Sequence, residues 1–228
     1  MSRALYQLAG LDDHRFSPFS WRARMALAHK GLEVELRDVK FCDRAPLEPS
    51  GQERVPVLVD GETWVADSWA IAEYLDATYP DAPSLLGNDE TRASIRFVNS
   101  WADAIFHAGI FGQIALDIFN HTCAEDREFF RTTREARAGM PLEDFQALRE
   151  SKLEAFRYSL MPVRLTVKRQ PYLGGEAPNY ADYIVFGGFQ WMRCASPWKA
   201  LAEDDPINPW FKRVSALFDG LGANASGY

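Results

Sequence analysis

Cysteine and histidine are scarce in this sequence, and their spacing excludes several classes of protein. The three cysteines, Cys42, Cys123 and Cys194, are odd in number and far apart, so they form neither a disulfide framework nor a zinc cluster. The four histidines show no metal-ligand spacing. We therefore expect a reduced compartment and no metal. A cysteine nucleophile is disfavoured, because no cysteine has a C-x-x-C partner.

Long basic runs and long hydrophobic runs are also missing. The formal net charge is −7, from 32 acidic and 25 basic residues, and no stretch of Lys and Arg is long enough to follow a phosphate backbone. The longest apolar stretches span only a few residues, and the amino terminus has neither an apolar core nor a small-residue cleavage site. We expect a cytoplasmic protein that binds neither nucleic acid nor membrane.

The first eighty residues show the pattern of a small α/β domain. Apolar residues make up 47% of the 228 residues, enough for two separate cores. The segment "RVPVLVDGETWV" predicts a hairpin around Asp60-Gly61. The helix start and stop signals and the alternating patterns predict, in chain order, a strand over 3–9, a helix from Ser17-Pro18 to Gly31, a strand over 32–39, the two hairpin strands, and a helix over 67–79.

The pattern changes after the segment "PDAPSLLGNDE", which has the composition of a linker. Hardly any β-rich alternation follows, and helical periodicity predicts helices over 89–119, 125–138, 141–169, 179–195 and 208–220. We therefore divide the chain into an α/β domain (1–80), a linker (81–89) and an all-helical domain (90–228). The expected fold class is α/β plus all-α.

Ser17 stands in front of Pro18 at the start of the first predicted helix. A serine followed by proline is a common helix start, because the hydroxyl caps free backbone N–H groups and proline fits the first helical position. The same helix terminus favours an anion. From the residues alone, Ser17 is either a cap or a cap that also holds a reactive atom. Ser20 lies one turn into the helix, and we expect it to point away from the terminus.

Three segments, taken together and in order, resemble one enzyme family. "SPFSWRARMAL", "ERVPVLVDG" and "DSWAIAEYLDATYP" are similar to the glutathione transferase family, and the resemblance covers nearly the whole chain. It implies a thioredoxin-like amino-terminal domain, a helical carboxy-terminal domain, glutathione as co-substrate and a homodimer. The later "YLGGEAPNYADY" matches a structural helix-start motif of the family, with Asn179 as the N-cap and Asp182 as its third following residue.

The resemblance implies a role for each of six residues in binding glutathione. Ser17 would hold the thiolate, and Arg54 would lie near the glycyl end. A cis peptide bond at Pro56 would turn the backbone of Val55 toward the cysteinyl part of the tripeptide. The acid–serine pair would bind the γ-glutamyl end, with Ser68 meeting the carboxylate and Asp67 the ammonium. From the residues alone, this pair is a plain helix cap, Pro56 is an ordinary trans proline, and Arg54 is a solvated surface charge.

The chemistry required of Ser17 is modest. A thiol with a pKa near ~8.5 needs a shift of about 1.5 units, or roughly 2 kcal/mol, to be half ionised at neutral pH. A hydroxyl hydrogen bond to a charged sulfur contributes roughly 1.5–3 kcal/mol, and the helix terminus adds about 0.3–1 kcal/mol. No general base is needed. We expect an aromatic-lined pocket for the second substrate, with Phe16 and Phe111 in contact with it.

Three functions are consistent with these residues, and a fourth is disfavoured. The leading one is glutathione conjugation of hydrophobic, aromatic electrophiles. Two segments, "WVADSWAIAEYLDATYPDAP" and "EDDPINPWFKRVSALFDGLG", resemble the etherase-related branch of bacterial β-aryl etherases and fungal relatives, which suggests glutathione-dependent ether cleavage as an alternative. A non-catalytic ligand carrier, or ligandin, needs the same pocket. Glutathione-dependent isomerisation is disfavoured, because relatives with that activity have a cysteine where this chain has Phe19.

Overall fold

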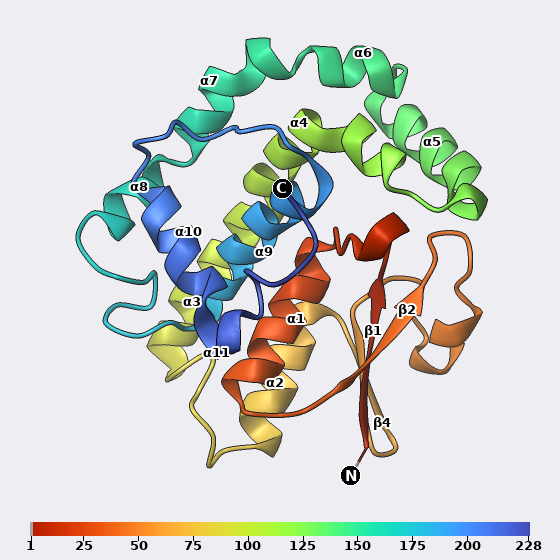
Figure 1. Ribbon diagram of the computed structural model, residues 1–228. Helices are drawn as coiled ribbons and strands as arrows, with labels where there is room; N and C mark the ends of the chain where they lie inside the picture. The colour runs from red at the N-terminus through yellow and green to blue at the C-terminus, as the bar shows by residue number, and fades with distance from the viewer. Residues whose placement is uncertain (1) are drawn as a thin grey trace.

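The computed structural model describes residues 2–228 and shows a small sheet domain followed by a larger group of helices (Figure 1). The expected fold class, α/β plus all-α, is confirmed. The elements of the sheet domain are β1 (Arg3–Leu8), η1 (Leu11–Asp13), α1 (Pro18–His29), β2 (Glu35–Val39), η2 (Ala45–Ser50), β3 (Val57–Asp60), β4 (Thr63–Ala66) and α2 (Ser68–Thr78).

The four strands form one mixed sheet in the order β2-β1-β3-β4. β1 pairs with β2 in parallel, while the β1–β3 and β3–β4 pairs are antiparallel. β2 is shorter than the predicted strand over 32–39, and four of its five residues are exposed because it lies at the edge of the sheet. The hairpin turn lies one residue later than the predicted Asp60-Gly61. Gly61, with φ of 61°, and Glu62 form the two-residue loop.

The second group contains helices only. Asp89–Asn120 is one continuous rod in which a π-helical turn interrupts the α-helix, whereas the stretch predicted over 141–169 is broken into three helices. The breaks fall at Leu148 and Leu160. The elements are α3 (Asp89–Trp101), η3 (Ala102–Phe106), α4 (His107–Asn120), α5 (Ala124–Ala138), α6 (Leu142–Ala147), α7 (Arg149–Ser159), α8 (Met161–Val167), α9 (Tyr180–Ala195), α10 (Ile207–Ser215) and α11 (Leu217–Gly220).

The rod from Asp89 to Asn120 is, by length and composition alone, able to cross a membrane, since one window of it is sufficiently apolar. Half of that window is buried inside the protein, and the core helix of a globular protein passes the same test. Phe106, Ile110 and Ile114 of this rod are fully buried. The apolar character of the helix is therefore accounted for by the core of the helical domain.

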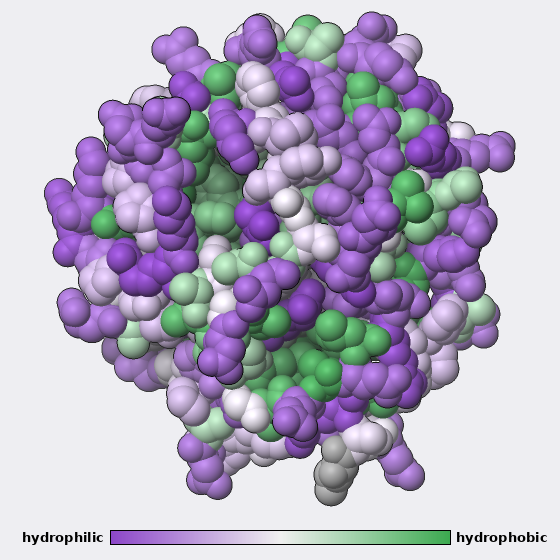
Figure 2. All heavy atoms as spheres, viewed as in Figure 1, coloured by the Kyte–Doolittle hydropathy of each residue, from purple (hydrophilic) through white to green (hydrophobic). Residues whose placement is uncertain are grey.

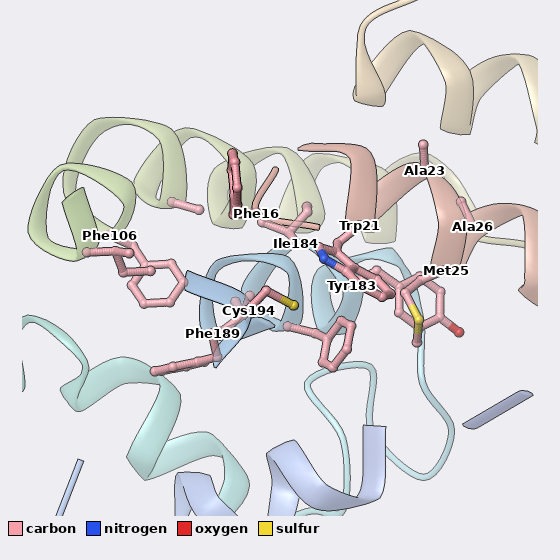
Figure 3. Packing of buried hydrophobic residues seen from close by; sticks show 14 of the residues in the cluster. Phe16, Trp21, Ala23, Met25, Ala26, Phe106, Tyr183, Ile184, Phe189 and Cys194 are labelled. Atoms are coloured by element: carbon pink, nitrogen blue, oxygen red, sulfur yellow. The ribbon is translucent and has the colours of Figure 1, made fainter. Parts of the chain in front are cut away.

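The two domains meet where α1 packs against α9. Trp21 and Met25 of α1 gather there with Tyr183 of α9, and all three are at most 1% exposed (Figure 3). Gly187 permits the close approach, because a Cβ atom at this position would lie 2.5 Å from the carbonyl oxygen of Pro18. The first turn of α1 is therefore positioned by backbone contact with the helical domain.

The segment between α2 and α3 is fastened to the sheet domain. The carboxylate of Asp76 accepts hydrogen bonds from the N–H groups of Leu85 and Leu86, both at 2.9 Å, and pairs with Lys30 at 2.7 Å. Burial acts to raise the pKa of Asp76, but these hydrogen bonds outweigh it and the pKa is lowered. Leu85 and Leu86 are fully buried, so this connection is an ordered part of the core.

Candidate active site

The strand topology brings three loops to one edge of the sheet. The chain leaves β1 at Leu8 and reaches Ser17 nine residues later. Because β3 runs antiparallel to β1, its start at Val57 lies beside Tyr6, near the end of β1. Because β4 runs antiparallel to β3, its last residue, Ala66, lies opposite Val57. The predicted residues that follow β1, precede β3 and follow β4 therefore share this edge.

Ser17 caps α1, as its sequence position predicts. Its backbone is extended, with φ of −110° and ψ of 112°, and its Oγ accepts a hydrogen bond from the Ser20 N–H at 3.2 Å. The Ser20 hydroxyl donates to the same oxygen at 3.0 Å. The expectation that Ser20 points away from the terminus is therefore wrong, because the third helical residue lies on the same side as the N-cap and can reach back to it.

The Ser20 N–H and the Ser20 hydroxyl both donate to the Ser17 oxygen, which leaves the Ser17 O–H as its one unused hydrogen-bonding group. A serine hydroxyl has two acceptor lone pairs and one O–H donor, and both acceptor positions are occupied by Ser20. Within the described residues, the Ser17 O–H has no acceptor. Ser17 is only 5% exposed, so water screens this group poorly. The geometry thus presents one hydrogen-bond donor, at a helix amino terminus, to an incoming anion.

The peptide bond between Val55 and Pro56 is cis, as the resemblance implied. The carbonyl oxygen of Pro56 accepts the Asp67 N–H at 3.2 Å, so the loop before β3 and the loop after β4 are joined directly. Val55 is half-buried. Arg54, one residue earlier, is exposed and therefore reaches the surface at the same edge.

Asp67 and Ser68 begin α2. Oδ1 of Asp67 accepts the N–H groups of Trp69 at 2.8 Å and Ala70 at 3.1 Å, so this carboxylate is a helix cap. Asp67 has φ of 80°, a left-handed conformation that a non-glycine residue adopts only when the surroundings hold it. Ser68 is 1% exposed, and its carbonyl oxygen accepts the hydroxyl of Tyr180. The helical domain thus contacts the start of α2 directly.

The two phenylalanines predicted to contact substrate lie in different surroundings. Phe16 is 3% exposed, and its ring stacks on that of Phe41 at 6.1 Å, so it is part of the core beneath the loop. Phe111 is half-buried and packs with its ring 6.4 Å from that of Trp191 and 5.7 Å from that of Phe145. Phe111 therefore presents ring surface that a ligand can contact, whereas Phe16 does not.

Arg22 of α1 is an interdomain contact. Its guanidinium is 1% exposed and donates to Asn99 and to Asp103, both at 2.9 Å. His107 lies 3.2 Å from the same guanidinium, and burial together with Arg22 lowers the pKa of His107 well below its usual value. This network fixes the first two turns of α1 against the helical rod, and His107 stays neutral at physiological pH.

None of the cysteines has the surroundings of a nucleophile. Burial raises the pKa of Cys194 to about 11. Cys42 is exposed, and a hydrogen bond to Asp126 together with desolvation raises its pKa. Cys123 is half-buried. Within residues 2–228, no group of three or more His, Cys, Asp or Glu side chains is placed to hold a metal ion.

Two contacts of the site differ from or lie outside what the sequence predicted. The Ser20 hydroxyl has a signal in the S-x-x-S spacing, which places a second polar side chain three residues after the N-cap. The contact between the Tyr180 hydroxyl and the Ser68 carbonyl has no local signal, because the two residues lie 112 positions apart.

Comparison with known proteins gives a consistent result for both halves of the chain. Residues 16–78 match the family model described as "Glutathione S-transferase, N-terminal domain", and residues 93–217 match "Glutathione S-transferase, C-terminal domain". The chain is 26% identical over 207 residues to glutathione S-transferase U28 of Arabidopsis thaliana, an alignment that covers 86% of this chain and 80% of that protein.

Several solved structures of similar fold superpose on almost the full length of this chain. A glutathione transferase of Phanerochaete chrysosporium has a TM-score of 0.83 at 23% identity and covers 94% of this chain and 96% of its own. A glutathione S-transferase of Ceriporiopsis subvermispora, solved in complex with glutathione, has a TM-score of 0.80 at 25% identity, with coverages of 96% and 97%. The β-etherase LigF of Sphingobium sp. strain SYK-6 has a TM-score of 0.68 at 22% identity, with coverages of 95% and 96%.

Proposed function

The chain belongs to the glutathione S-transferase family, and from this premise we propose that it binds glutathione and activates its thiolate at Ser17. The thiolate then attacks a hydrophobic, aromatic electrophile and forms a thioether while the leaving group departs with the bonding electrons. The helix terminus and the Ser17 hydroxyl stabilise the charged sulfur. Arg54, the Val55 backbone, Asp67 and Ser68 hold the tripeptide at the shared edge of the sheet. We assign the protein to cytoplasmic detoxification.

One observation carries this proposal. The Ser17 O–H is the donor left over after Ser20 fills both acceptor positions of the oxygen. A plain capping serine needs no second donor on its oxygen, since one backbone N–H satisfies the cap. With Ser20 donating to the Ser17 oxygen, the Ser17 O–H remains free to donate to a thiolate.

Turnover tests this function directly. The purified chain is incubated with glutathione and chlorodinitrobenzene, a neutral aromatic electrophile, and the thioether is followed by absorbance. We expect saturable conjugation well above the uncatalysed rate. A protein that binds glutathione but gives no turnover with any member of an electrophile panel would be a carrier, and that result would contradict the proposal.

Ether cleavage is tested in the same assay with a different substrate. A β-aryl ether ketone carrying a fluorogenic phenol releases that phenol when glutathione displaces it at the carbon beside the carbonyl. The likeness to LigF supports the fold alone, so we rank conjugation above ether cleavage. Release of the phenol together with a glutathione adduct would reverse that order.

We also propose a homodimer in which the sheet domain of one chain faces the helical domain of its partner. Phe97 on α3 is 75% exposed and Ile105 on the same rod is 50% exposed, which leaves an apolar face without a cover. Sedimentation at micromolar concentration is expected to show twice the chain mass of 25.8 kDa, and Phe97→Glu is expected to shift the protein toward the single-chain mass.

Tyr158→Glu is the matched control for this prediction. Tyr158 on α7 is 78% exposed, and its replacement introduces the same charge at an aromatic position outside the proposed interface. The control should leave the dimer intact. A wild-type species of 25.8 kDa would contradict the homodimer, and equal effects of the two variants would contradict the role of Phe97.

A further inference from the structure

The start of α2 has few hydrogen-bond donors left for a ligand. The N–H groups of its first three residues, Ser68, Trp69 and Ala70, have no acceptor within the helix. Oδ1 of Asp67 accepts two of them, from Trp69 at 2.8 Å and from Ala70 at 3.1 Å. The N–H and the hydroxyl of Ser68 have no partner among residues 2–228. A carboxylate can accept about four hydrogen bonds, so the two donors of Ser68 would not satisfy one.

Arg96 on α3 approaches the same place from the helical domain. Its guanidinium carbon lies 4.1 Å from the centre of the Trp69 ring, a cation–π contact with the second residue of α2. Trp69 is 5% exposed, and its ring lies 5.9 Å from that of Tyr180, whose hydroxyl donates to the carbonyl oxygen of Ser68. The contacts of Trp69 and Tyr180 therefore hold Arg96 beside the start of α2.

The guanidinium of Arg96 is not paired with an acid. Within the part of the chain that the structure describes, no carboxylate lies within ion-pair distance of it. Stacking on the indole uses the flat face of the guanidinium, so the N–H groups at its edge stay free. Hydrophilic residues cover most of the viewed face of the molecule (Figure 2), so exposure alone gives Arg96 no special role. Its position is the relevant feature, because it stacks on the residue directly after Ser68.

We propose that Arg96, together with Ser68, binds the free carboxylate of the γ-glutamyl residue of glutathione, and so determines the specificity of this end of the site. This inference rests on the proposed function, because it concerns the same glutathione site. Asp67 can pair with the ammonium of that residue, since its Oδ2 makes no hydrogen bond within residues 2–228. Each of the two ligand charges then has a protein charge of opposite sign beside it.

Binding is measured with S-methylglutathione, which has no free thiol and therefore reports affinity without turnover. Two amides of this ligand each remove one carboxylate: the first converts the γ-glutamyl carboxylate, and the second converts the glycyl carboxylate. The two amides carry the same net charge, so a difference between them reports position and not overall charge. In isothermal titration of the full chain, we expect the γ-glutamyl amide to bind about tenfold more weakly than S-methylglutathione.

Arg96→Gln tests which carboxylate the guanidinium binds. The variant is expected to weaken S-methylglutathione and the glycyl amide about tenfold, and to leave the affinity for the γ-glutamyl amide within about twofold. Equal losses for all three ligands would mean that Arg96 only supports the structure around Trp69, and the proposal would be wrong. If the glycyl amide is the unaffected ligand, Arg96 serves the other end of the tripeptide, which also contradicts the proposal.

Arg92→Gln is the matched control. Arg92 lies on α3 one turn before Arg96 and carries the same charge, but it lines a separate hollow together with Lys30 and Asp76. The control should keep the affinities for all three ligands within about twofold. A loss equal to that of Arg96→Gln would mean a general effect of positive charge on α3 and would overturn the assignment.

Turnover separates this role from that of Ser17. We expect Arg96→Gln to raise the KM for glutathione about tenfold with kcat within about twofold, because the carboxylate lies far from the reacting sulfur and is held equally before and during the reaction. An unchanged KM would refute the assignment. Binding of S-methylglutathione without turnover of any electrophile would contradict the proposed function, while the titrations still test Arg96. No binding of S-methylglutathione would contradict both.

Discussion

Ser17→Ala is expected to lower the rate of conjugation at least tenfold while glutathione affinity stays within a few-fold. The hydroxyl acts on the thiolate, and its loss removes a charge-assisted hydrogen bond of roughly 1.5–3 kcal/mol, whereas the other contacts still hold the tripeptide. The pH midpoint of the reaction should also rise toward the ~8.5 of a free thiol. Steady-state kinetics over a pH series measure both effects. Unchanged turnover in a folded variant would refute the assignment.

Two further variants separate the chemical role from the cap. Asn88→Ala removes the N-cap of α3, where Asn88 Oδ1 accepts the Thr91 N–H at 2.9 Å, and costs about 1 kcal/mol of stability, as the loss of the Ser17 cap does. It should leave conjugation unchanged. Ser20→Ala keeps the Ser17 hydroxyl but removes one donor to its oxygen, so we expect a smaller loss of rate than in Ser17→Ala.

Asp182→Ala is expected to cause the largest loss of stability of any variant considered, about 3–5 kcal/mol. The Asp182 carboxylate is fully buried at the start of α9 and accepts hydrogen bonds from the N–H groups of Leu173, Gly174 and Asn179, at 2.7–3.1 Å. The indole of Trp210 adds a fourth, at 2.8 Å. Alanine would leave these four donors, including the fully buried Trp210 indole, without an acceptor. Thermal unfolding should show a Tm lower by on the order of 10 °C.

Asp204→Ala is the control for this loss. Asp204 is exposed, and within residues 2–228 its side chain makes no hydrogen bond or ion pair. Its replacement should therefore change stability by no more than about 0.5 kcal/mol. A Tm of Asp182→Ala that matches the control would mean that the four donors find other partners, and the proposed role of Asp182 would be wrong.

The local signals of this sequence predict its local structure well. Asn179 and Asp182 form the capping box that their spacing indicates, and Ser17 and Asp67 cap the helices that follow them. These signals work because a cap and its partners lie within four residues, where the backbone geometry is known. The same reasoning, applied to the S-x-x-S spacing, would have placed Ser20 on Ser17.

The interdomain features have no such local signal. The partners of Arg22 on the helical rod, Asn99 and Asp103, follow only from the packing of α1. The contact in which Asp126 of α5 accepts the N–H of Phe41 joins residues 85 positions apart, and no local pattern links them. The break of the stretch over 141–169 into three helices is also absent from the periodicity, which continues through Leu148 and Leu160.

The contact of Gly187 with Pro18 couples the stability of the two domains. If the domains separated without unfolding, Trp21 and Met25 would pass from almost complete burial to water, at about 1.5–3 kcal/mol each. The buried Arg22 would also lose its partners. These costs disfavour an independent sheet domain that keeps its first helix in place. Ser17 is part of the amino-terminal domain by sequence, but the stability of its position is a property of the whole chain.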